Sequence, residues 1–187
     1  QLKDRATAAL TVLLDHNINL SYNLLRMGTV AAWQGKLNVQ DTKYKRYRGE
    51  GQPFIQGSEI PGLGLWQWTY GDQLDSLQKS TGVRTPLPTA YLDYHGHYVY
   101  KKDVVLSYSI VGRNVLEFPQ AIKTGDQIIL SQTLSVSPGE SAQRIYIGQL
   151  ENGSKRKSKD ITALINPKSH HFIAAGIMSS DKDIRCE

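Results

Sequence analysis

The sequence has a single cysteine, Cys186, so no disulfide can form within it, and it contains no Cys-x-x-Cys-His motif for haem attachment. It also has no apolar run near the roughly 20 residues that a membrane-spanning helix requires. The chain begins at Gln1 without a charged and then apolar leader, which fits a processed protein or a piece of a longer one. These absences predict no transmembrane segment and no haem site within these residues.

Common catalytic motifs are missing as well. No nucleophile elbow and no Gly-Lys-Ser/Thr phosphate loop occurs, and the glycine-containing residues 62–66 are too short for a dinucleotide fingerprint. The carboxylates form no recognisable pair in sequence, although a glycosidase pair needs proximity only in space. The carboxylates considered are Glu59, Asp72, Asp75, Asp93, Asp103 and Glu117. The sequence therefore predicts no catalytic residue and names no reaction.

Charge is modestly positive, with a formal net charge of +5. The excess lies mainly in residues 43–48 and 155–159, both beside glycine and polar residues, which is typical of solvated loops. Tyr44 and Tyr47 stand within the first cluster, but we find no pattern that places basic and aromatic residues together on one face, as a nucleic-acid surface does. We therefore predict that the chain does not bind nucleic acid.

What the sequence does have is alternation of apolar and polar residues. In residues 103–112, Val104, Leu106, Tyr108 and Ile110 fall on one side and serines on the other, the pattern of a half-buried strand. About eight such segments occur with turn signals between them and no alternation of strands with helices. We predict an all-β antiparallel sandwich in a single domain, residues 1–187, with at most short helices.

Further strands are predicted in residues 127–136, where an apolar face is broken only by Gln132, and in residues 143–150, 160–167 and 170–178. Residues 8–25 are predicted to form two strands joined at residues 15–17. Residues 23–37 fit a short helix, with Leu20, Leu24, Met27 and Ala31 at helical spacing, as well as they fit a strand that breaks at Gly28. Trp33, in this segment, is predicted to lie in the core.

Residues 41–90 have a different texture, rich in glycine, proline and polar residues. We predict a long surface excursion here, and such excursions are often functional. Within it, Trp66 and Trp68 stand two residues apart and Tyr70 follows. These rings either stack on the apolar face of a sugar or anchor the excursion to the sandwich.

The segment YLDYHGHYVY, residues 91–100, holds His95 and His97 two residues apart. On a strand both imidazoles would lie on one face, a spacing that metal sites use, but further ligands would have to come from distant residues. Tyr94, Tyr98 and Tyr100 would line the opposite face, where aromatic rows usually pack on a core. The segment predicts scaffold first and a metal site only as a minor alternative.

The order of motifs between residues 18 and 120 resembles an uncharacterised domain family found near the start of large exported proteins of planctomycetes, verrucomicrobia and Bacteroidetes. The family often has Phe-Asp-Thr before its leucines, whereas this chain has Ser21-Tyr22-Asn23. Any role that the family's aspartate has is therefore not transferred to Tyr22. The residues that carry the resemblance are Leu24, Leu25, Arg26, Trp33, Gly35, Leu37, Pro86, Leu87, Pro88, Tyr94, Gly96, Tyr98, Val104 to Tyr108, Val115, Leu116, Glu117 and Pro119.

The resemblance implies a context more than a chemistry. Such domains often precede a glucose or sorbosone dehydrogenase-like propeller and a c-type cytochrome domain, so haem c or quinone would belong to the parent protein and no cofactor to this chain. The resemblance also implies a periplasmic or extracellular location.

We therefore expect a noncatalytic accessory module of a sugar-oxidising protein, which binds carbohydrate or docks a neighbouring domain. The alternative is a hydrolase or lyase that acts on polysaccharide with carboxylates or His95 and His97 in a cleft. The ligand-binding residues predicted from aromatic display and from the resemblance are Trp66, Trp68, Tyr70, Tyr94 and Tyr98, with Arg26 and Glu117 as polar supports.

Overall fold

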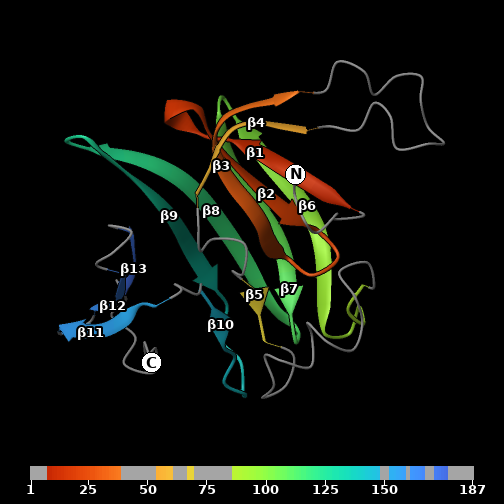
Figure 1. The fold of residues 1–187 in the computed structure, drawn as a ribbon. Coiled ribbons are helices and arrows are strands. Elements are labelled where there is room, and N and C mark those ends of the chain that lie inside the picture. The colour runs from red at the N-terminus through yellow and green to blue at the C-terminus, as the bar shows by residue number, and fades with distance from the viewer. Residues whose placement is uncertain are drawn as a thin grey trace.

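The computed structural model describes residues 8–38, 54–60, 67–69, 86–147, 152–158, 161–166 and 171–176. Its elements are almost entirely strands, so the predicted all-β fold is confirmed (Figure 1). The elements are β1 Ala9–Leu13, a 3-10 turn η1 Asp15–Asn17, β2 Ile18–Asn23, β3 Gly28–Asn38, β4 Phe54–Glu59, β5 Gln67–Trp68, β6 Leu92–Tyr100, β7 Asp103–Ile110, β8 Arg113–Thr124, β9 Gln127–Val136, β10 Ile145–Tyr146, β11 Ser154–Ser158, β12 Ile161–Asn166 and β13 His171–Gly176.

Two four-stranded antiparallel sheets form the body of the protein. Their strand orders are β1-β2-β3-β4 and β6-β7-β8-β9, so each sheet is a run of consecutive hairpins. Strands β5 and β10 pair as a small ribbon, and β11-β12-β13 form a third sheet. Among the described residues no helix is long and apolar enough to cross a membrane.

The core lies between the two large sheets. Leu20 and Tyr22 of β2 pack in one cluster with Leu106, Tyr108 and Ile110 of β7, together with residues of β3, β5 and β8. All of these side chains are fully buried. The inward residues of β7 are those that the apolar alternation predicted, because a strand with one covered face must place every second side chain in the core.

The turns place residues at positive φ, a conformation that Gly112 adopts readily and the β-branched Val111 does not. β7 and β8 are joined by Val111 and Gly112, both at positive φ, as a two-residue hairpin loop requires. Between β2 and β3 the chain turns at residues 24–27, and Met27 is at φ 46. The helical alternative for residues 23–37 is therefore wrong: Gly28 begins a strand of 11 residues, and Trp33 on it is buried as predicted.

Part of the predicted surface excursion belongs to the sheets. β4 pairs with β3, and Gly57 lies opposite Gly35, where the two backbones approach too closely for a side chain on either residue. Trp68 of β5 is in the core. Strand β4 is mostly exposed and so remains a surface segment, whereas burial of Trp68 against β7 agrees with the alternative in which this ring anchors the segment to the sandwich. In residues 143–150, only Ile145–Tyr146 form a strand within the described part.

Candidate functional site

A β-bulge divides the tyrosine-rich strand β6 into two parts. Tyr94 lies opposite Tyr108 and Gly96 opposite Ser107, so His95 is an extra residue without a partner in the register. Gly96 is at φ 133, a backbone conformation that glycine adopts easily. The inserted residue reverses the alternation, so side chains on either side of the bulge do not keep the faces that a regular strand would give them.

The bulge corrects two predictions about this strand. His97 lies opposite buried Leu106, so it shares the inward side with Tyr94, and the Tyr94 hydroxyl lies 2.7 Å from His97 Nδ1. Tyr98 and Tyr100 lie on the other face. The prediction that Tyr94, Tyr98 and Tyr100 share one face of the strand, with both histidines on the other, is therefore wrong.

His95 and His97 have no further metal-ligating residues placed beside them in the part of the chain that the structure describes. His95 Nε2 lies 3.8 Å from the Asp93 carboxylate, and both side chains are exposed. No group of three or more histidine, cysteine or acidic residues in the described part of the chain is placed to hold a metal ion.

Beyond the bulge, two tyrosine rings extend into solvent. Tyr98 is 65% exposed and Tyr100 71% exposed, which is unusual for large aromatic side chains on a sheet. They belong to the same face because they are two residues apart in the regular part of β6. Lys101 Nζ lies 5.4 Å from the centre of the Tyr100 ring. The prediction that these two rings pack in a core is wrong, and they form a displayed aromatic pair.

The polar centre of the molecule is buried rather than displayed. Glu117 of β8 is fully buried between the sheets and accepts two hydrogen bonds, from Tyr22 Oη at 2.9 Å and from Tyr108 Oη at 2.8 Å. Trp68 Nε1 donates to Tyr108 Oη at 2.9 Å, and Gln132 Nε2 approaches Tyr22 Oη at 3.5 Å. Five strands, β2, β5, β7, β8 and β9, thus contribute to one hydrogen-bonded cluster, which we call the Glu117 network.

Burial dominates the electrostatics of this network. Removal from water raises the pKa of Glu117 from 4.5 to about 7, although the hydrogen bonds from Tyr108 and Tyr22 favour its ionised form. Burial, followed by the adjacent Glu117 carboxylate, raises the pKa of Tyr22 well above its usual value, and the same two causes raise that of Tyr108. Both phenols therefore stay protonated and act as donors.

The predicted ligand-binding residues that the structure describes do not share one exposed surface. Trp68 is 3% exposed and Glu117 is sealed in the core, so neither is presented to solvent, and Arg26 is also buried, with a pKa lowered by that burial. The displayed residues among them are Tyr98 and, in part, Tyr94. Trp66 and Tyr70 lie outside the described residues.

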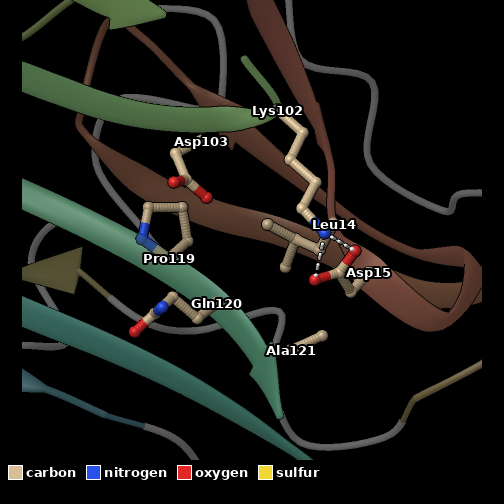
Figure 2. A pocket seen from close by; sticks show the side chains of 7 residues that line it. All are labelled: Leu14, Asp15, Lys102, Asp103, Pro119, Gln120 and Ala121. Atoms are coloured by element: carbon tan, nitrogen blue, oxygen red, sulfur yellow. Dashed lines mark hydrogen bonds and ion pairs between the residues drawn. The ribbon is translucent and has the colours of Figure 1, made fainter. Parts of the chain in front are cut away.

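A shallow hollow lies where the η1 turn meets the start of β7 and the middle of β8 (Figure 2). Its volume is about 40 Å³, room for water molecules but far below the several hundred Å³ of a small-molecule site. Lys102 Nζ donates to both carboxylate oxygens of Asp15, at 2.7 and 2.9 Å, across its rim. Pro119 also lines the hollow. Pairing of β8 with β7 ends at Glu117, two residues before Pro119, so the N–H that proline lacks is not needed for a hydrogen bond to β7.

Sequence reasoning missed the Glu117 network, although two signals pointed to it. Glu117 alternates with Val115 and Pro119 on the inward face of β8, and Gln132 interrupts the apolar face of β9. A polar residue on an apolar face needs a buried partner. The pattern alone did not reveal that Tyr22, from the other sheet, supplies it.

The fold and this site define an all-β module whose polar centre is internal and whose displayed feature is an aromatic pair on β6. Residues 20–117 match the model of a domain of unknown function (DUF6797), and because the match covers more than half of the chain, the chain belongs to this family. The matched segment runs from β2 to Glu117 and so includes Tyr22, Trp68 and Tyr108. No curated protein and no solved structure matches the chain.

Proposed function

We propose that this chain is a noncatalytic binding module that contacts carbohydrate through the displayed pair Tyr98 and Tyr100. The observation that carries the proposal is the exposure of both rings, 65% and 71%, on one face of β6. With a rise of about 3.3 Å per residue, their attachment points are about 7 Å apart, a spacing at which two rings can stack along an extended sugar chain. Lys101, beside Tyr100, adds a hydrogen-bond donor for sugar hydroxyls.

The wider context of the proposal comes from the motif order between residues 18 and 120. We propose that the module belongs to an exported bacterial protein and serves a sugar-oxidising partner domain of the quinoprotein dehydrogenase and c-type cytochrome kind. A polysaccharide-cleaving activity has less support, because Glu117 is closed off from solvent whereas Asp93 is exposed on the outer strand.

The proposal is tested by calorimetric or NMR titration of the 187-residue chain with a panel of neutral oligosaccharides. Tyr98→Ala and Tyr100→Ala are each expected to weaken binding about tenfold, equivalent to about 1.4 kcal/mol. Val99→Ala is the matched control, since Val99 is 63% exposed on the opposite face of the same strand. Failure of every oligosaccharide to bind, or binding that the tyrosine variants leave intact, would remove the proposal.

A further inference from the structure

Strand β6 is an outer strand of its sheet, paired only with β7 within the described residues. Its last five residues, Gly96–Tyr100, carry no charged side chain. Such an edge presents a row of backbone donors and acceptors, and natural proteins usually protect it with charge. The outer strand β11 shows that protection, with Lys155, Arg156 and Lys157 in succession.

The hairpin register determines which backbone groups of β6 face outward. Tyr100 lies opposite Asp103 across a two-residue loop, so this pair closes the hairpin with hydrogen bonds, and Tyr98 with Val105 is the next such pair. Alternate residues of a strand direct their N–H and C=O groups to opposite sides. The N–H and C=O groups of His97 and Val99 therefore point away from β7, toward the free edge.

We propose that the edge of β6 pairs antiparallel with the same strand of a second copy of this chain, about a twofold axis at Tyr98. In this register His97 of each copy lies opposite Val99 of the other, which joins the outward backbone groups in about four hydrogen bonds. The two sheets then become one continuous sheet across the axis.

Side chains on β6 are self-complementary in this register. Tyr100 lies opposite Gly96 of the other copy, so an aromatic ring covers a residue without a side chain, an arrangement that stabilises glycine at strand edges. The strand begins near the carboxylate of Asp93 and is followed by the cation of Lys101. Antiparallel pairing brings the Lys101 end of each copy to the Asp93 end of the other, which favours a second copy as the occupant over an unrelated strand.

The bulge at His95 limits the extent of the pairing. Beyond Gly96 the regular backbone repeat is lost, so the paired segment is short and the interface is small. We expect a reversible dimer that forms at micromolar concentrations rather than an obligate one. The dimer does not depend on carbohydrate binding, although it would bring the displayed tyrosines of the two copies together on one face.

Sedimentation velocity of the 187-residue chain, from about 5 to about 500 μM and without sugar, tests the pairing. Concentration-dependent dimerisation is expected. Val99→Pro removes an N–H that faces the free edge and is tolerated by an outer strand, so it should abolish the dimer with the fold retained. Val99→Ala keeps that N–H and should leave the dimer intact.

Two further variants keep the test decisive if Val99→Pro does not fold. Tyr98→Lys sets like charges opposite each other at the twofold axis and should prevent dimerisation. Asp93→Lys should weaken the dimer, and adding Lys101→Asp to the same chain should restore it. A folded chain that is monomeric at every concentration, or a dimer that Tyr98→Lys and Val99→Pro leave unchanged, would overturn the proposal.

Discussion

The clearest consequence of the Glu117 network is a pH-dependent stability that Glu117→Gln should abolish. The folded chain holds the Glu117 proton more tightly than the unfolded chain, because burial raises the pKa from 4.5 to about 7. Folding is therefore accompanied by proton uptake between these two values, and the contribution of this group to stability falls as the pH rises from 4.5 to 7. Below pH 4.5 the carboxyl is protonated in both states and the penalty is absent.

The size of the effect follows from the same values. At about 1.4 kcal/mol for each pKa unit, ionisation of Glu117 above pH 7 costs the folded state about 3 kcal/mol. Glutamine retains the shape of the protonated acid and carries no charge. The network can accommodate glutamine at position 117 because Oε1 of Gln132 is buried without a hydrogen-bond partner. If the Gln132 amide rotates by half a turn, the Tyr22 hydroxyl can donate to Gln132 Oε1 and accept a hydrogen bond from the new amide at position 117.

Urea denaturation followed by tryptophan fluorescence at pH 5, 6, 7 and 8 measures this difference. Glu117→Gln should differ least from the parent chain near pH 5 and exceed it by up to about 1.5 M in midpoint at pH 8, for a slope of about 2 kcal/mol per M. Comparison of the two chains cancels pH effects that do not involve residue 117. The exposed Glu140→Gln is the matched control and should show no such trend. A parent chain whose advantage over Glu117→Gln grows with pH would refute the reasoning.

Other substitutions test one close backbone contact and one buried hydrogen bond. Gly57→Ala should lower the free energy of unfolding by more than about 3 kcal/mol or prevent folding, because a Cβ there collides with the backbone oxygen of Gln34. Gly96→Ala, at a similar positive φ but with open space around it, should lower it by about 1–2 kcal/mol in thermal or urea denaturation. Equal losses of stability would contradict the steric reason. Trp68→Phe removes the N–H donated to Tyr108 and should lower the free energy of unfolding by about 1–2 kcal/mol, measured by urea denaturation with circular dichroism; an unchanged midpoint would show that this hydrogen bond contributes nothing net.

Local patterns predicted the strands well where one face is covered. Residues 106–110 alternate strictly because Leu106, Tyr108 and Ile110 pack on the opposite sheet while the serines between them do not. The turn at residues 15–17 was also predicted, because Asp-His-Asn is a polar break between two apolar segments. Within it, His16 and Asn17 adopt positive φ, which asparagine tolerates better than most residues.

Predictions of which face a side chain occupies failed where the backbone repeat itself changes. One extra residue at His95 moves Tyr98 and Tyr100 to the face opposite Tyr94, and only the neighbouring Gly96 hinted at it. The environment of Trp68 was equally inaccessible, since a tryptophan in a glycine-rich stretch is displayed or buried according to contacts made far away in sequence. Its burial against Tyr108, 40 positions further on, is such a contact.

The strand order of the two large sheets has a further consequence. Every hydrogen-bonded neighbour in these sheets is also the next strand along the chain, so each half of the sandwich contains all of its own ladder pairing. Side chains, with Tyr22 and Tyr108 meeting on Glu117 at their centre, make most of the described contacts between the halves, and one backbone hydrogen bond, from the Leu87 N–H to the Leu25 carbonyl, adds to them. A polypeptide severed between the halves would keep both complementary faces, so its two fragments are suited to reassemble when mixed.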